Sequence, residues 1–191
     1  MVVKNYVSWK NGSEGTTKNI YFDNCVIWTD LAQSMEIGFE TIGDLMDNIN
    51  FTNITVLHNF HKAPISIHNG NNALITNVTY KNIVIEDASM GKGDGKNILI
   101  DIASEFSTTW STNHKVTAVG DIDGVLIENV TVYNSNNPLV SIRGSYDARS
   151  GYQSYHYVSN VTIKNVIISN VKLDETYSNY QNNYANNIRF E

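Results

Sequence analysis

The sequence has a single cysteine, Cys25, among 191 residues, so no disulfide bond can form within the chain. It has only two prolines, and no apolar run approaches the roughly 20 residues that a membrane-spanning helix needs. The first residues, "MVVKNYVSWKNG", lack the apolar core of a signal peptide. We therefore expect no membrane partner, and no signal peptide within this chain.

Positive charge is also scarce. Lys and Arg total 13 against 19 Asp and Glu, the net charge is −6, and the basic residues are scattered. This excludes the basic patch that typically binds nucleic acid. The zinc, phosphate-loop and serine-nucleophile motifs are missing as well, and "GDIDG" (120–124) is only a fragment of a calcium loop. The sequence therefore predicts no metal site and no cofactor.

What the sequence does contain is a nine-residue repeat of the form N-φ-x-φ-x-N-φ-x-φ, where φ is apolar. The first three copies start 29 residues apart, and longer intervals of 47 and 36 residues follow. Regular repeats of this length are typical of solenoid proteins. The five copies are "NIYFDNCVI" (19–27), "NINFTNITV" (48–56), "NVTYKNIVI" (77–85), "GVLIENVTV" (124–132) and "NVTIKNVII" (160–168).

The apolar residues change phase inside each copy. Ile49 and Phe51 share one face of a strand, whereas Ile54 and Val56 are out of step with them. A bend at the second Asn keeps both pairs pointing inward, and Asn tolerates the left-handed conformation that such a bend needs. We expect these bend asparagines to stack and to hydrogen-bond from one copy to the next. They are Asn24, Asn53, Asn82, Asn129 and Asn165.

A third apolar strand recurs between the copies, as "MEI" (35–37), "ISI" (65–67), "IDI" (100–102) and "VSI" (140–142). Three short strands per repeat, each about 4.8 Å from its equivalent in the next repeat, describe a coil of parallel strands. The prediction is one all-β domain over residues 1–191, a right-handed parallel β-helix of about five to six rungs. A β-sandwich is the alternative, but hairpin signals between equal strands are few.

The third strand is where a ligand should bind, because the insertions 86–97 and 104–123 flank it and decorate one face. Aligned outward positions there form columns. The first column reads Glu36, Ser66, Asp101, Ser141, and the second reads Gly38, His68, Ala103, Arg143. Glu40 and Glu105 follow just beyond, and "MVVK" extends the second column backwards to Lys4.

Carboxylates, a histidine and basic groups on one face suit a polyhydroxylated ligand, so a polysaccharide or oligosaccharide is the expected partner. Glu36 and Asp101 are two rungs apart, roughly 9.6 Å at the sheet spacing. Inverting glycosidases hold two carboxyl groups about 6.5–9.5 Å apart, which makes Glu36 and Asp101 the catalytic candidates. The substrate-binding candidates are Lys4, Glu40, His68, Glu105 and Arg143. Phe39, at a strand end, is expected to cap the core.

Three segments carry a family resemblance: "NIYFDNCVIWTDLAQSMEIGFET" (19–41), "APISIHNGNNALITNVTYKNIVIED" (63–87) and "GSYDARSGYQSYHYVSNVTIKNVIISNVKL" (144–173). They resemble the later rungs of β-helical glycoside hydrolases of the polygalacturonase-like and dextranase-like families (28 and 49). The resemblance covers nearly the whole chain. It implies inverting hydrolysis of a polysaccharide by an acidic pair, secretion as part of a parent protein, and a β-helix that continues before Met1.

In the dextranase-like pattern a lysine follows the acidic pair by a few residues, so Lys4 implies a pair that precedes Met1. The chain would then be the C-terminal part of such an enzyme, inactive if the pair is missing. An uncapped first rung would expose strand edges and favour end-to-end self-association. Two alternatives to the hydrolase remain open: a non-catalytic carbohydrate-binding or adhesin-like β-helix, and a polysaccharide lyase that uses Lys4 or Arg143 as its base.

Overall fold

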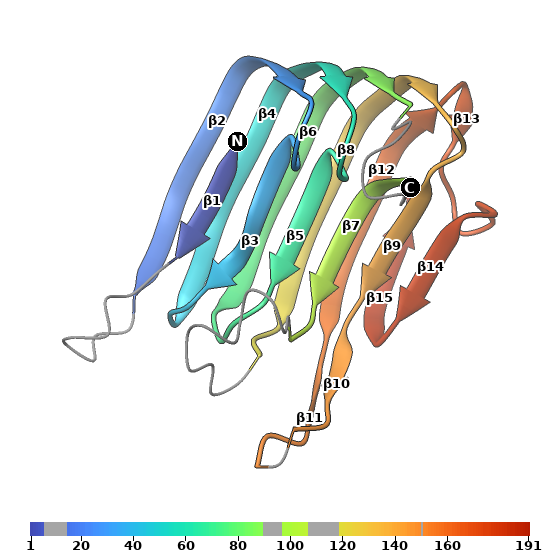
Figure 1. Cartoon of the computed structure of the whole chain (residues 1–191). Coiled ribbons are helices and arrows are strands. Elements are labelled where there is room, and N and C mark those ends of the chain that lie inside the picture. Colours follow the sequence, from blue (N-terminus) through green and yellow to red (C-terminus); the bar gives the residue numbers. More distant parts are fainter. Residues whose placement is uncertain (6–14, 90–96, 107–118, 150) are drawn as a thin grey trace.

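The computed structural model describes residues 1–5, 15–89, 97–106, 119–149 and 151–191, and this part of the chain is built from strands without any helix. The chain alternates between two sheets that lie face to face (Figure 1). Sheet A contains β1 (Val2–Asn5), β3 (Met35–Thr41), β5 (Ile65–Asn69), β7 (Ile98–Ser104), β9 (Leu139–Arg143) and β14 (Tyr180–Asn183). Sheet B contains β2 (Thr16–Thr29), β4 (Leu45–Asn59), β6 (Leu74–Ala88), β8 (Ile122–Ser135), β12 (Val158–Ile168), β13 (Val171–Lys172) and β15 (Ala185–Phe190).

Most neighbouring strands in both sheets run parallel, as the repeat predicts. The antiparallel exceptions lie near the C-terminal end. The short strand β13 pairs antiparallel with β12, and β10 (Ser145–Asp147) and β11 (Ser154–His156) form a hairpin that projects beyond β9 (Figure 1). The all-β, mainly parallel character predicted from the sequence is therefore confirmed.

The prediction of three separate strands per repeat is wrong in one respect. The two short strands expected on either side of each bend asparagine form a single long strand of sheet B, such as β4 over residues 45–59. Parallel pairing with the neighbouring strand resumes directly after each bend, so the hydrogen-bonded ladder is not interrupted long enough to divide the strand.

The bends themselves are confirmed. Asn24, Asn53, Asn82, Asn129 and Asn165 all have φ between 50° and 55°, in the left-handed region. The first Asn of each copy bends too, with φ of 52–59°, and Gly124 takes that place in the fourth copy with φ of 82°. The sequence analysis missed this first bend, although the buried apolar residues on its two sides are three positions apart, as Met46 and Ile49 are, which is also a change of phase.

The predicted asparagine ladder is also present along most of its length. The side-chain amide of Asn82 donates to Asn53, Asn129 to Asn82, and Asn165 to Asn129, over 2.9–3.1 Å. The step at the N-terminal end of the ladder differs, because the side-chain amide of Asn53 donates to Asp23 Oδ1 rather than to Asn24. Each ladder amide thus gives its neighbour one hydrogen bond at a position where the strand bends.

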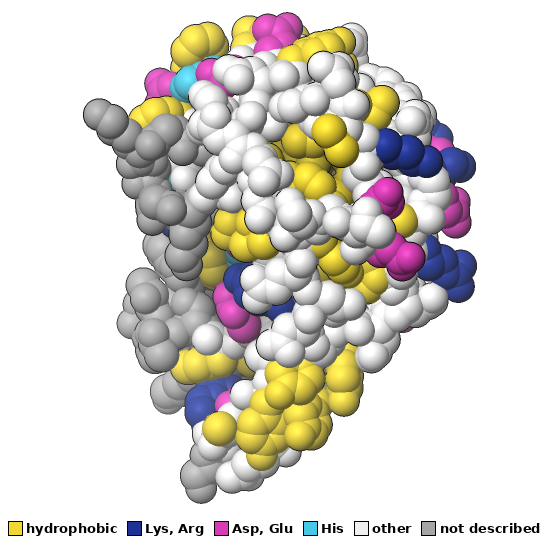
Figure 2. All heavy atoms as spheres, turned by 90° about the vertical axis from the view of Figure 1, so that its right-hand side faces the viewer, with side chains coloured by type: hydrophobic (Ala, Val, Ile, Leu, Met, Phe, Trp, Pro, Cys, Tyr) yellow, Lys and Arg dark blue, Asp and Glu magenta, His cyan; other side chains and the backbone are white. Residues whose placement is uncertain are grey.

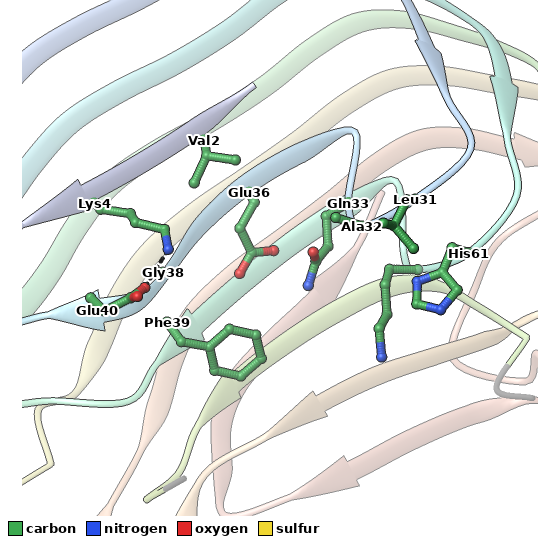
Figure 3. A pocket seen from close by; sticks show the side chains of 11 residues that line it. Val2, Lys4, Leu31, Ala32, Gln33, Glu36, Gly38, Phe39, Glu40 and His61 are labelled. Carbon is green, nitrogen blue, oxygen red and sulfur yellow. Dashed lines mark hydrogen bonds and ion pairs between the residues drawn. The ribbon is translucent and has the colours of Figure 1, made fainter. Parts of the chain in front are cut away.

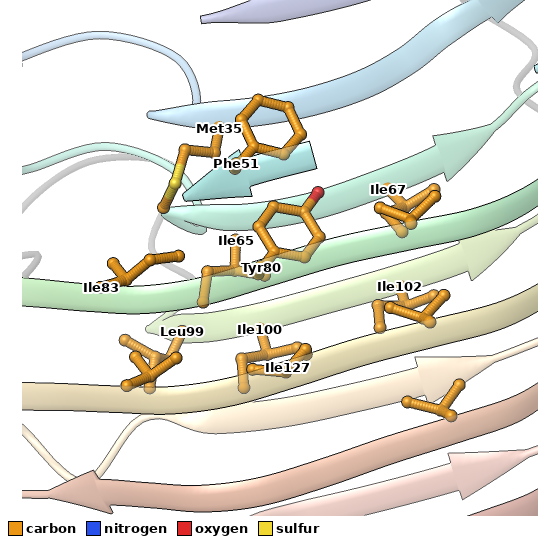
Figure 4. Packing of buried hydrophobic residues seen from close by; sticks show 14 of the residues in the cluster. Met35, Phe51, Ile65, Ile67, Tyr80, Ile83, Leu99, Ile100, Ile102 and Ile127 are labelled. Carbon is orange, nitrogen blue, oxygen red and sulfur yellow. The ribbon is translucent and has the colours of Figure 1, made fainter. Parts of the chain in front are cut away.

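The core lies between the two sheets and consists of stacked aliphatic and aromatic side chains (Figure 4). Phe22, Phe51 and Tyr80 form a continuous stack with ring centroids 5.1 and 4.9 Å apart. The Tyr80 hydroxyl donates a 3.0 Å hydrogen bond to the carbonyl oxygen of Ser66 across the interior. On β3 and β5, Met35, Ile37, Ile65 and Ile67 point into this core, so the residues between them point outward.

The predicted register of sheet A is confirmed over four strands. Glu36 pairs with Ser66, Ser66 with Asp101 and Asp101 with Ser141, while Gly38, His68, Ala103 and Arg143 form the next column. The extension to β1 is only partly right. Val2 and Val3 pair with Glu36 and Ile37, but the register shifts before Asn5, so Lys4 has no regular place in the His68 column.

Candidate functional site

A chain of ion pairs runs across the outer face of sheet A, centred on His68 of β5. Nδ1 of His68 lies 2.9 Å from Glu36 Oε1 on β3, and Nε2 lies 3.0 Å from Asp101 Oδ2 on β7. Arg143 of β9 donates to the other oxygen of Asp101 and, over 3.0 Å, to Glu105 Oε1. We call Glu36, His68, Asp101, Arg143 and Glu105 the charge network. The parallel register brings these residues together, because Glu36 and Asp101 share one column of sheet A, His68 and Arg143 share the next, and Glu105 follows directly after β7.

Electrostatics make His68 a cation in this network. Burial lowers the pKa of His68, but the hydrogen bonds and charges of Asp101 and Glu36 outweigh that effect and raise the pKa to about 9. The imidazolium therefore donates from both nitrogens. Burial likewise raises the pKa of Asp101, yet His68 and Arg143 together hold the pKa of this carboxyl below its usual 3.8. At neutral pH, Asp101 is an anion with both oxygens bound by cations.

The sequence analysis expected the outward column to face solvent, but the column is buried. Glu36 is 2% exposed and Asp101 is 7% exposed. Phe39 contributes to this cover, because its ring stacks on the imidazole of His68 with centroids 4.2 Å apart and planes 4° apart. Phe39 is therefore part of the site rather than a cap of the core. The sequence analysis placed Phe39 at a strand end, whereas it lies inside β3 and its ring turns toward His68.

Gly38 allows this close packing. A Cβ atom at this position would lie 2.0 Å from the carbonyl oxygen of His68, and the φ of 120° is one that other residues rarely adopt. Only glycine lets β3 approach β5 closely enough beside the network.

One carboxylate oxygen in the network remains without a partner among the described residues. Oε2 of Glu36 is buried and accepts no hydrogen bond. Glu36 lines a pocket of about 330 Å³ together with Phe39, Gln33, Lys4, Glu40 and Lys62, and Figure 3 shows its carboxylate between the Lys4–Glu40 pair and Gln33, above the ring of Phe39. A buried acceptor without a donor is costly, so a donor brought by a ligand would stabilise this oxygen.

A second hollow of about 120 Å³ lies over the other half of the network, lined by Phe39, His68, Asp101, Glu105 and Arg143 among others. Phe39 and Lys62 line both hollows. The two hollows together therefore follow sheet A from β3 to β9, across the strands.

The structure brings most of the predicted site residues together. Glu36, Asp101, His68, Arg143 and Glu105 form the charge network, while Lys4 and Glu40 form a separate ion pair at the edge of the larger pocket (Figure 3). Gln33, Phe39 and Lys62 also line the hollows and were not predicted. The flanking insertions are described only in part, because residues 90–96 and 107–118 lie outside the described residues.

Within the described residues, His, Cys, Asp and Glu side chains form no group of three or more that could hold a metal ion. A search of the same residues finds no helix that could cross a membrane. Comparison of the chain with protein-family models, with curated proteins and with solved structures gave no match.

Proposed function

We propose that this chain is a polysaccharide-acting protein that binds a glycan along the outer face of sheet A. We further propose that its two sheets form a right-handed parallel β-helix of the kind found in glycoside hydrolases. The observation that carries the proposal is the buried charge network beneath two adjoining hollows, with one unpartnered oxygen on Glu36.

The chemistry of the site supports a polyhydroxylated ligand. A sugar hydroxyl can donate to Glu36 Oε2, which accepts from no described group. The ring of Phe39 lines the same pocket beside that carboxylate and contributes to its apolar lining. A mostly apolar pocket with a few fixed polar groups is the usual form of a small-ligand site.

Glycoside hydrolysis is the activity we propose for this site, with Glu36 as one of the two carboxyls that the reaction needs. The partner role predicted for Asp101 is less well supported. The imidazole of His68 stands between Glu36 and Asp101 and binds both, so the two carboxylates do not flank an open gap in which a water molecule and a glycosidic bond could react. Asp101 is better suited to position His68 and Arg143.

The test is a binding and cleavage assay with dextran and polygalacturonate as soluble probes. We expect the chain to bind one of them, and Glu36→Gln to weaken that binding by about tenfold because a carboxylate acceptor is lost. Glu86→Gln, an exposed carboxylate on β6 outside both hollows, is the matched control. Release of reducing ends by the chain would support hydrolysis, and unsaturated products that absorb in the ultraviolet would point to a lyase. Absence of binding to both probes would contradict the proposal.

A further inference from the structure

Four tyrosines gather on one side of the β10–β11 hairpin and the adjoining turn between β14 and β15. Tyr146 and Tyr155 are direct cross-strand neighbours on the hairpin, with ring centroids 4.9 Å apart. Tyr155 also contacts Tyr184, at 5.5 Å, and Tyr157, at 6.3 Å. We call Tyr146, Tyr155, Tyr157 and Tyr184 the tyrosine platform. Its centre is Tyr155, which touches the other three rings.

The platform is open to solvent although it is apolar. Tyr146, Tyr155 and Tyr184 are 44%, 54% and 41% exposed. Figure 2 shows a continuous patch of hydrophobic side chains at the lower end of the molecule, at the height of the hairpin. Clustered exposed aromatic rings on a soluble surface are typical of a binding site rather than of a scaffold.

The backbone beneath the platform is held firmly. The Gly144 amide donates a 2.7 Å hydrogen bond to Asn183, and a Cβ on Gly144 would lie 2.0 Å from the carbonyl oxygen of His156. Asp147 and His156, on the opposite side of the hairpin from the tyrosines, are buried. Asp147 accepts hydrogen bonds from the Arg149 side chain. The rings therefore keep their arrangement without a ligand, which lowers the entropy cost of binding.

The platform is continuous with the proposed glycan-binding face. A third hollow is lined by Glu105, Phe106, Tyr146, Asp147 and Arg149 among others, so it runs from the last carboxylate of the charge network to the hairpin, where it contacts Tyr146 as well as Asp147 of the opposite side. Glu105 also lines the hollow above Asp101 and accepts from Arg143. A chain-like ligand on sheet A that follows these hollows would arrive at Tyr146.

We propose that the tyrosine platform is a second glycan-binding surface, which stacks against sugar rings of a polymer whose other residues occupy the hollows of sheet A. This inference rests on the function proposed above. The four side chains carry no charge, and each offers a flat apolar face beside a hydroxyl group. A pyranose ring is complementary to such a surface, because it presents C–H groups on its face and hydroxyls at its edge. The contact area grows with the number of rings covered, so long polymers gain most.

The test compares Tyr155→Ala and Tyr146→Ala with wild-type protein by affinity electrophoresis in gels that contain dextran or polygalacturonate. Tyr133→Ala is the matched control, since Tyr133 is 65% exposed but lies on β8 of sheet B. We expect each platform variant to bind the polymer about tenfold more weakly, and the control to bind like wild type. Binding of a disaccharide of the same sugar should be unchanged, because it is too short to span both surfaces. Equal thermal unfolding temperatures would show that the variants are folded.

The two proposals fail in different ways. If wild-type protein binds the polymer, and Glu36→Gln weakens binding while Tyr155→Ala does not, the platform proposal is wrong and the sheet A proposal stands. Wild-type protein that binds neither polymer would overturn both. If sedimentation shows a wild-type dimer that Tyr155→Ala converts to a monomer, the platform is a self-association surface and the second glycan surface is refuted.

Discussion

Nε2 of His68 lies 3.0 Å from Oδ2 of Asp101, although the two residues are 33 positions apart in the sequence. The pair links β5 to β7, and Glu36 on β3 extends it through the other ring nitrogen. A protonated histidine between two buried carboxylates links three strands of sheet A, and it makes the stability of the fold depend on pH.

Stability should fall as the pH rises above neutral. The pKa of His68 is about 9 in the folded protein against the usual 6.5 of a histidine, so the stability that the protonated ring contributes is complete below pH 6.5 and disappears as the pH passes 9. The difference between these values corresponds to about 3–4 kcal/mol of unfolding free energy, at about 1.4 kcal/mol per pH unit. Urea unfolding between pH 6.5 and 9.5 measures it. An NMR titration that places the His68 pKa at or below 6.5 would contradict the prediction.

Replacement of Asp101 by Asn should destabilise the fold and lower the pKa of His68. The change removes the anion that faces both His68 and Arg143 in a buried setting, which we expect to cost about 2–4 kcal/mol of unfolding free energy. Asp44→Asn is the control, since this carboxylate is exposed, and it should change stability by less than about 0.5 kcal/mol. Equal effects of the two substitutions would show that the network does not stabilise the fold.

The asparagine ladder can be tested at Asn82, which has φ of 55° and makes one ladder hydrogen bond on each side. Asn82→Ala loses both bonds and also strains the backbone, so we expect a loss of about 2–3 kcal/mol. Asn82→Gly loses the bonds but adopts positive φ freely, so it should cost about 1 kcal/mol less than Ala. Thermal unfolding of both variants gives the comparison. Equal losses would mean that positive φ does not contribute to the choice of Asn.

Gly124 allows a test of the first bend of the repeat, at which the other copies have Asn. It occupies the place held by Asn19, Asn48, Asn77 and Asn160 in the other copies, with φ of 82°. A Cβ atom there would meet its nearest neighbour at 3.6 Å, an ordinary contact. We expect Gly124→Asn to stabilise the protein by about 0.5 kcal/mol, because the unfolded chain loses freedom, whereas Gly124→Val should destabilise it by about 1–2 kcal/mol. A destabilising Asn would contradict the equivalence of the two positions.

The repeat made much of the fold predictable, and its limits are equally physical. Alternation of apolar residues, a phase change at Asn and a regular interval predicted the strands, the bends and the sheet A register. The last strands were missed for two reasons. β14 reads "YQNN" and lacks that alternation, whereas β15 carries only the first half of the repeat, "NIRF" (187–190), in which Asn187 bends with φ of 55°. The β10–β11 hairpin was missed as well, since "SYDARSGYQSYH" has no two-residue turn signal.

The sequence by itself determined which residues stand side by side, because parallel strands in a fixed register bring Glu36, Ser66, Asp101 and Ser141 into one column. It could not determine how those side chains meet. The ring of His68 reaches between two carboxylates from the neighbouring column, Phe39 covers it, and Glu36 keeps one free oxygen in a pocket. These features depend on side-chain direction, on close backbone approach at Gly38 and on burial. All three arise only when the strands are packed together in space.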